Sequence, residues 1–160
     1  MAAPYRGHGR GVDVMRVVRG ILKNDRPLGD SLGIRNVDRQ LLYSVAHDLY
    51  GKARYDLAQY LFAQLVLYDN KDPRYMKGLA AATQVLGQYE YAVHMYSVAA
   101  LMDVNDPSVV MHAGDCFRAM GKHARAFDSF DLARSMCSRP EHKLIKLRCD
   151  QALAGIRQAA

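Results

Sequence analysis

The chain has 160 residues, of which 50% are hydrophobic and 24% are charged, and its formal net charge is +6. This length fits one domain with a continuous core, and no apolar run is long enough for a secretory signal or a membrane span. The excess positive charge lies in the flanks, because residues 40–139 hold ten basic and ten acidic residues, so no basic stripe favours binding to nucleic acid.

The N-terminal flank begins with a leader and a short helix. Residues 1–12 contain glycine and arginine but few apolar residues, and we expect them to be disordered. Residues 13–38 are expected to form an N-terminal helix and a connector. The helix has an apolar stripe at Val14, Met15, Val18, Ile21 and Leu22. Because a helix this short is not stable alone, it docks either on the array that follows or on a second copy of the chain. We expect a dimer contact through Val14, Val18, Ile21 and Leu22.

The connector is rich in turn residues, from Arg26-Pro27 to Gly33. Its apolar side chains are the candidate anchors that hold it on the array. These anchors are Leu28, Leu32 and Ile34.

Three stretches repeat one pattern with an offset of 34 residues: 39–72, 73–106 and 107–138. Small residues recur at the eighth and twentieth positions, and a large aromatic ring follows four residues after the second of them. The three sets are Ala46, Ala80 and Gly114, then Ala58, Ala92 and Ala126, then Phe62, Tyr96 and Phe130. This period and these small residues are typical of the tetratricopeptide repeat, a helix-turn-helix unit that stacks on its neighbours. We therefore expect an all-α fold, a right-handed superhelical array of three such helix pairs.

Turn and capping residues mark the ends of the predicted helices. Asp72-Pro73 and Asp106-Pro107 indicate helix starts, because aspartate caps free amide groups and proline suits the first helical position. Gly87 and Gly121 follow the first helix of their repeats, where a left-handed conformation favours glycine. The first repeat has Ala53 in the equivalent place, so we expect it to be the least regular.

Residues 139–160 form a C-terminal capping helix in this interpretation. Its apolar positions would cover the exposed face of the third repeat, and they are Leu144, Ile145, Leu147, Leu153 and Ile156. The three cysteines have no paired spacing and are expected to be free thiols in a reducing cytoplasm; they are Cys116, Cys137 and Cys149.

Stacked helix pairs create a concave surface lined mainly by the first helix of each pair. Tyr43, His47 and Tyr50 share one face of the first helix because they are four and three residues apart. The equivalent positions are Arg74, Lys77, Ala81 and Gln84 in the second repeat, and Met111, Asp115 and Arg118 in the third. Tyrosines suit a groove that grips an extended peptide. The alternative is that Tyr43 and Tyr50 pack the connector.

No pattern of a catalytic or metal site stands out. His112 and Cys116 lie four residues apart on one helix face, but two ligands do not make a zinc site, and neither Cys-x-x-Cys nor His-Glu-x-x-His occurs. We expect a protein that is not an enzyme and that holds no metal or cofactor. A rival interpretation is an adaptor that grips a terminal carboxylate through Lys77, Arg74 and Arg118.

Two blocks of the sequence resemble a known family, the class II chaperones of bacterial type III secretion. One block is Leu42-Tyr43-Ser44-Val45-Ala46, with Tyr50, Tyr55 and Ala58 after it. The other, which is the more specific, runs from Gly87-Gln88-Tyr89-Glu90-Tyr91 to Met102-Asp103. Members of that family are helper proteins that bind two hydrophobic translocator proteins, which later form a pore in the host membrane.

The resemblance implies a chaperone of the bacterial cytoplasm that keeps translocators soluble and competent for secretion, without inserting into a membrane itself. An N-terminal segment of the translocator would lie in the concave groove, and the N-terminal helix would mediate homodimer formation. Carried over by position, the family's groove residues match Tyr43, Tyr50, Tyr55, Leu79 and Tyr96. Together with the helix-face argument, the predicted groove comprises Tyr43, His47, Tyr50, Tyr55, Lys77, Leu79, Ala81, Gln84, Tyr96 and Met111.

Overall fold

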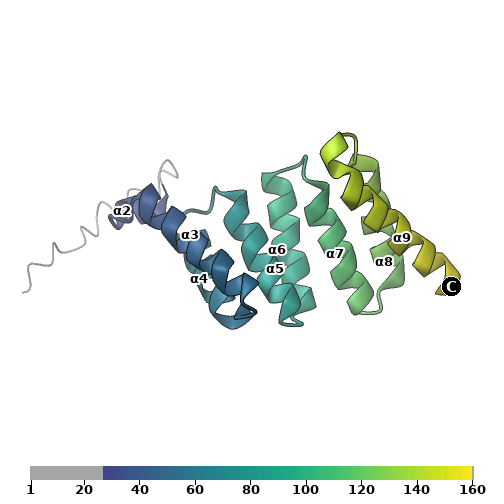
Figure 1. The fold of residues 1–160 in the computed structure, drawn as a ribbon, viewed down its shortest axis with the longest axis horizontal. Coiled ribbons are helices and arrows are strands. Elements are labelled where there is room, and N and C mark those ends of the chain that lie inside the picture. Colours follow the sequence, from purple (N-terminus) through teal and green to yellow (C-terminus); the bar gives the residue numbers. More distant parts are fainter. Residues whose placement is uncertain (1–26, 160) are drawn as a thin grey trace, which may run out of the picture.

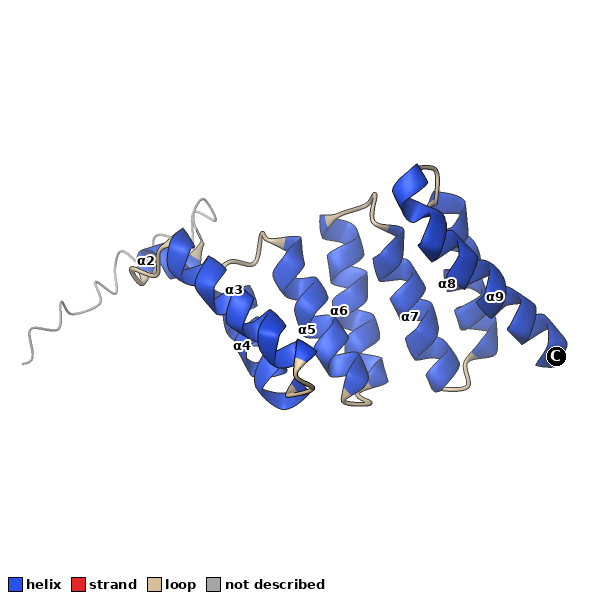
Figure 2. Cartoon of the chain, viewed as in Figure 1, coloured by secondary structure: helices blue, strands red, loops and turns tan. Residues whose placement is uncertain are grey.

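The computed structural model describes residues 27–159, and all regular structure in that range is helical (Figures 1 and 2). Three helix pairs follow one another along the array. They are α3 (Asn36–Gly51) with α4 (Tyr55–Tyr68), α5 (Pro73–Val85) with α6 (Tyr89–Met102), and α7 (Pro107–Ala119) with α8 (His123–Met136). A short helix α2 (Leu28–Ser31) precedes them, and a 3-10 turn η1 (Pro140–His142) and helix α9 (Lys143–Ala159) follow. The expected all-α array of three helix pairs is confirmed.

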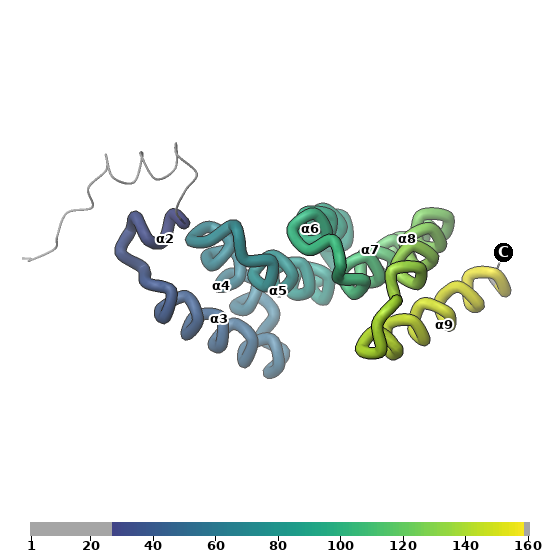
Figure 3. The backbone as a smooth tube through the Cα atoms, turned by 90° about the horizontal axis from the view of Figure 1, so that it is seen from above, coloured from purple at the N-terminus to yellow at the C-terminus, as the bar shows by residue number. Residues whose placement is uncertain are grey.

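The helices form two layers along a curved row. Each helix from α3 to α9 packs on the next one in sequence, and α3 also contacts α5 as α7 contacts α9. Seen from above, α4, α6 and α8 lie along one side, whereas α3 and α9 stand at the two ends of the other side (Figure 3). The first helix of each pair therefore faces the inside of the curve together with α9.

Small residues bring the two helices of each pair together. Ala46, Ala58, Ala80, Ala92 and Ala126 are completely buried. The aromatic rings beside them are 1–3% exposed; they are Phe62, Tyr96 and Phe130. A Cβ placed on Gly114 would lie 3.0 Å from the Phe130 ring, so this third-repeat position leaves little space for a side chain. The packing of small against large residues repeats as the sequence predicted.

Capping and turn residues lie where the sequence placed them. The side chains of Asp72 and Asp106 accept hydrogen bonds at 2.9 Å from the backbone amides of Arg74 and Ser108. Gly87 and Gly121 adopt φ angles of 78° and 71°. Ala53 takes the same left-handed conformation, with φ 58°, at the equivalent place in the first repeat. The first turn thus keeps the geometry of the other two, although its side chain makes that geometry strained.

A charged residue that the sequence analysis did not consider anchors the connector, and of the three expected apolar anchors only Leu32 is exposed, whereas Leu28 and Ile34 are half-buried. Leu32 is 38% exposed, whereas Arg39 on α3 is only 4% exposed. The Nη1 of Arg39 donates to Asp30 Oδ1 at 2.6 Å and to the carbonyl oxygen of Ile34 at 2.8 Å. Its Nε lies 3.8 Å from a carboxylate oxygen of Asp69 at the end of α4. A buried cation therefore fastens α2 and its loop to the first helix pair. The predicted dimer residues Val14, Val18, Ile21 and Leu22 lie outside the described residues.

The last helix covers the third pair, but not with all the residues expected. Cys149 and Leu153 of α9 are buried against α7 and α8, and Ile145 and Ile156 are partly buried there. The prediction that Leu144 and Leu147 also cover the third pair was wrong, because these side chains are 74% and 52% exposed.

The cysteines in the described part of the chain are free thiols. Cys116 and Cys149 are buried and Cys137 is half-buried. Burial raises the pKa of the Cys116 thiol to about 12 and that of Cys149 to about 11, so both stay protonated at neutral pH.

The strained turn at Ala53 generates a stability prediction. The substitution Ala53→Gly relieves the left-handed strain and should raise the free energy of unfolding by about 0.5–1 kcal/mol, measured by urea denaturation. The matched control is Gly87→Ala, which introduces the same strain in the second repeat and should lower it by about 1 kcal/mol. A loss of stability in Ala53→Gly would show that the left-handed conformation of Ala53 is not strained.

Candidate functional site

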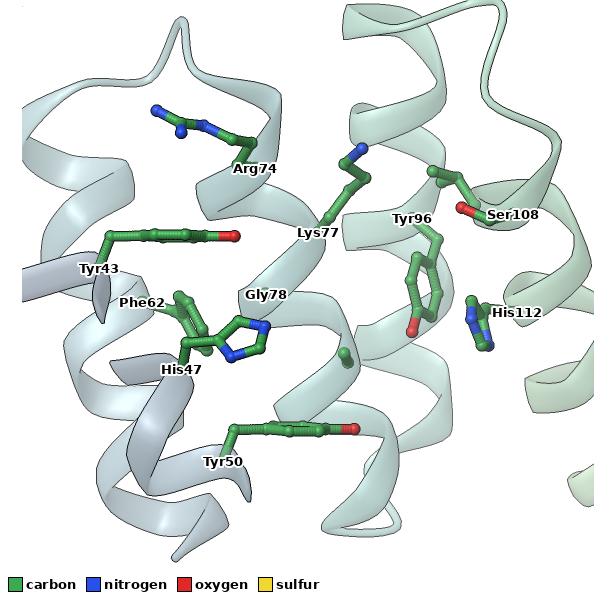
Figure 4. Close-up of a pocket in the computed structure, with 12 residues that line it drawn as sticks. Tyr43, His47, Tyr50, Phe62, Arg74, Lys77, Gly78, Tyr96, Ser108 and His112 are labelled. Carbon is green, nitrogen blue, oxygen red and sulfur yellow. The ribbon is translucent and has the colours of Figure 1, made fainter. Parts of the chain in front are cut away.

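A cavity of about 330 Å³ opens between the first helices of the three pairs (Figure 4). We call it the tyrosine cavity. Its lining comes from Tyr43, His47 and Tyr50 on α3, Phe62 on α4, Arg74, Lys77, Gly78 and Ala81 on α5, Tyr96 on α6, and Ser108, Val109 and His112 on α7. Six of the ten predicted groove residues are among them: Tyr43, His47, Tyr50, Lys77, Ala81 and Tyr96.

The other four predicted residues lie elsewhere. Tyr55 packs edge-on against Tyr50, with 5.2 Å between the ring centroids, and Gln84 accepts a hydrogen bond from the Tyr96 hydroxyl at 2.7 Å. Both therefore support residues of the lining. Leu79 is 8% exposed and belongs to the core rather than to this cavity. Met111, which is 2% exposed, borders a second cavity between α7 and α9 instead.

Tyr43 forms the centre of the aromatic wall on α3. Its ring centroid lies 6.0 Å from that of Phe62 and 5.7 Å from that of Tyr75, and the guanidinium carbon of Arg74 lies 5.2 Å above it. These partners all belong to the first two helix pairs. The contacts therefore favour a tyrosine that shapes the cavity over one that packs the connector.

Tyr96 and His112 form the opposite wall. Their rings stack with centroids 5.7 Å apart and 15° between the planes. Burial lowers the pKa of His112, although Asp115 opposes this effect, so the imidazole is neutral at pH 7. Burial also raises the pKa of the Tyr96 hydroxyl. This wall is therefore uncharged under physiological conditions.

Gly78 and the Phe62 ring meet at the floor of the cavity. A Cβ at this position would lie 2.5 Å from the Phe62 ring, so only glycine lets that ring reach the floor. The equivalent positions in the other repeats are Ser44 and His112, which means that the second repeat departs from its neighbours here. Ala81, one turn further along α5, is a second small residue of the lining.

The cations around the cavity already have partners within the chain. Lys77 Nζ lies 2.8 Å from Asp106, and Arg74 Nη2 lies 2.6 Å from Asp72. Burial alone would raise the pKa of Asp106, but hydrogen bonds from Lys77 and Ser108 lower it below its usual range. Each of these two cations is balanced by its own aspartate, so this end of the array has no excess positive charge to attract a terminal carboxylate.

A second, smaller cavity of about 220 Å³ lies between α7 and α9. Its lining includes Met111, Asp115, Arg118, Phe130, Arg148, Gln151 and Ala152. Asp115 lies 2.8 Å from Arg118 and 3.2 Å from Arg148. We call it the arginine cavity. Arg118, the third basic residue of the carboxylate-adaptor interpretation, lies here rather than beside Lys77.

Sequence reasoning missed five residues of the tyrosine cavity: Phe62, Gly78, Ser108, Val109 and His112. Phe62 was assigned to the core from its alignment with Tyr96 and Phe130, and His112 was considered only as a metal ligand. The repeat could have identified two of them, because Gly78 and His112 are 34 residues apart and therefore lie on equivalent faces of α5 and α7, and both faces border the cavity.

Within residues 27–159 no group of three or more His, Cys, Asp or Glu side chains is arranged to hold a metal ion. Cys116, the suggested partner of His112, is buried in the core of the second and third pairs. No helix in the same range combines the length and apolarity needed to cross a membrane.

Several proteins of known role resemble this chain. Low calcium response locus protein H of Yersinia pseudotuberculosis is 35% identical over 117 residues, which are 72% of this chain and 70% of that protein. The type III secretion chaperone SycD of Yersinia enterocolitica, solved with a peptide of the translocator YopD, is 33% identical, with a TM-score of 0.75 over 79% of this chain and 97% of SycD. PcrH of Pseudomonas aeruginosa, solved with the chaperone binding region of PopD, is 33% identical, with a TM-score of 0.77 over 79% of this chain and 96% of PcrH. No protein-family model matches the chain.

The cavity floor can be tested by stability. Gly78→Ala places a methyl group against the buried Phe62 ring and should lower the free energy of unfolding by about 1–3 kcal/mol. The control is Gly155→Ala on α9, where an added Cβ meets no atom of the described residues within 4 Å, and it should raise stability by up to about 1 kcal/mol. Equal effects of the two substitutions in urea denaturation would show that Phe62 does not occupy this place.

Proposed function

This chain belongs to the class II chaperones of type III secretion translocators, and from that premise we propose that its tyrosine cavity holds an N-terminal segment of a hydrophobic translocator protein. Bound in this way, the translocator stays soluble and competent for secretion. The site of action is the bacterial cytoplasm, and the partners are the hydrophobic translocators of a type III secretion system.

The observation that carries this proposal is the tyrosine cavity itself, with an aromatic wall on each side and a floor made by Gly78 and Ala81. Tyr43 and Tyr50 are half-buried, so part of each ring is available to a ligand. Burying apolar side chains against such rings contributes about 25 cal/mol for each Å² removed from water. The rings lose little rotamer freedom on binding, which favours a tight grip on an extended segment.

Chaperone activity of this kind requires no catalytic group. The lining offers aromatic surface, a neutral imidazole at His112 and basic groups engaged in ion pairs. We propose that the protein is a binding protein, without enzymatic activity and without a cofactor. The carboxylate adaptor is the second candidate, and the paired state of Lys77 and Arg74 counts against it.

We also propose that the chain forms a homodimer through Val14, Val18, Ile21 and Leu22. SycD, the Yersinia enterocolitica relative, has been solved in an alternative dimer. The apolar stripe of these four residues supplies a hydrophobic face that a second copy can bury.

The aromatic wall on α3 is tested by the double substitution Tyr43→Ala with Tyr50→Ala. We expect affinity for the YopD peptide, measured by isothermal titration calorimetry, to fall by about 100-fold or more, because two aromatic contacts near the centre of the site are lost. Circular dichroism should show that the variant keeps its helices.

The matched control is Tyr60→Ala with Tyr91→Ala. These tyrosines are 62% and 68% exposed and lie on α4 and α6, in the other layer of the array. This control should bind the peptide as the unaltered protein does. If a folded Tyr43/Tyr50 variant binds equally well, the tyrosine cavity is not the site.

The two candidate functions differ in what the end of the ligand contributes. A chaperone groove binds an internal segment, so the YopD peptide with a free carboxyl end and the same peptide with an amidated end should bind within twofold of each other. A carboxylate adaptor would lose at least tenfold on amidation. Fluorescence anisotropy with both peptides decides between them.

A further inference from the structure

The face that lines the tyrosine cavity continues into the third repeat. Met111, Asp115 and Arg118 lie 34 residues after Lys77, Ala81 and Gln84, so they occupy the same face of α7 that the earlier residues occupy on α5. Helix α9 contacts α7, as α5 contacts α3. The arginine cavity between α7 and α9 is therefore the next compartment along the inside of the curve.

His112 joins the two cavities. Its ring lines the tyrosine cavity and stacks on Tyr96, and its Nδ1 lies 3.8 Å from a carboxylate oxygen of Asp115 in the arginine cavity. A peptide that lies along the groove would therefore leave the aromatic tyrosine cavity and enter the charged arginine cavity at His112.

The arginine cavity holds an excess of positive charge in a fixed arrangement. The guanidinium groups of Arg118 and Arg148 both contact Asp115, whose side chain is only 13% exposed, while their own side chains are 51% and 55% exposed. The guanidinium carbon of Arg118 also lies 5.7 Å from the centre of the Phe130 ring. Two cations thus share one largely buried anion and keep part of their surface open to a ligand.

Both arginines contact Asp115 through Nη2. A guanidinium has five N–H donors, so most of the donors of each group stay available for a second acceptor. Met111 and Phe130 make part of the lining apolar. Positioned donors of this kind match a carboxylate group.

We propose that the arginine cavity binds an acidic side chain of the translocator segment that occupies the tyrosine cavity. This inference rests on the proposed function and adds a second requirement for the ligand, a glutamate or aspartate a few residues from its apolar anchors. In an extended chain, residues two apart point the same way and lie about 7 Å apart, so one segment can reach both cavities. The proposed ligand is apolar in one part and acidic in the next.

The test uses the YopD peptide as the probe, extended by a Gly-Ser linker and three glutamates at one end or the other, with three glutamines in the matched peptides. Affinities are measured by calorimetry with the full chain. We expect one glutamate peptide to bind about tenfold more tightly than its glutamine partner. This advantage should fall to less than twofold in the variant Arg118→Gln with Arg148→Gln, and in 0.5 M salt.

The control variant, Lys143→Gln with Lys146→Gln, removes two exposed positive charges from α9 outside the cavity lining and should keep the full glutamate advantage. Equal affinities for the glutamate and glutamine peptides overturn the inference and leave the chaperone function standing. An advantage that persists in the arginine variant, or disappears in the lysine control, also overturns it, because general charge attraction then explains the effect. If none of the peptides binds, the proposed function fails and the inference fails with it.

Discussion

The close approach of paired helices at small residues is the constraint on which the rest of this structure depends. Ala46 and Ala58 in the first repeat, with their equivalents in the next two, are completely buried or nearly so, and each pair places an aromatic ring beside them. This packing fixes the spacing of the first helices, and that spacing defines the room between α3, α5 and α7. Gly78 alters the pattern at one point, where the core residue Phe62 also reaches the floor of the tyrosine cavity. The site is therefore a local exception within a regular array.

Charge is arranged so that the cavity stays suited to an apolar guest. Residues 40–139 carry equal numbers of acidic and basic side chains, and the two cations nearest the tyrosine cavity, Arg74 and Lys77, each contact an aspartate that also caps a helix. The same aspartates thereby order the loops between repeats and hold the basic groups at the rim. In the arginine cavity, between α7 and α9, two arginines contact one aspartate, so basic groups outnumber acidic groups there.

The repeat period made most of the fold predictable. It located the helix pairs, the turns at Gly87 and Gly121, and the face that carries Tyr43, His47 and Tyr50. It could not separate neighbouring positions of one helix into core and cavity, because one residue corresponds to about 100° of rotation. Leu79 therefore lies in the core and Met111 borders the arginine cavity rather than the tyrosine cavity, while Phe62 and Gly78 were missed. The flanks lack a repeat to compare with, which explains why Arg39 was overlooked as the anchor of α2 and why Leu144 and Leu147 were assigned to the interface.

The one-dimensional contact pattern of the array has a consequence for its cooperativity. Each helix touches mainly its immediate neighbours, so the free chain resembles a row of coupled segments whose ends can open independently of the middle. A bound peptide that contacts α3, α5 and α7 together would link three helix pairs that are otherwise joined mainly through contacts between successive helices. Occupancy of the cavity would therefore couple these three pairs directly and stabilise them against local unfolding.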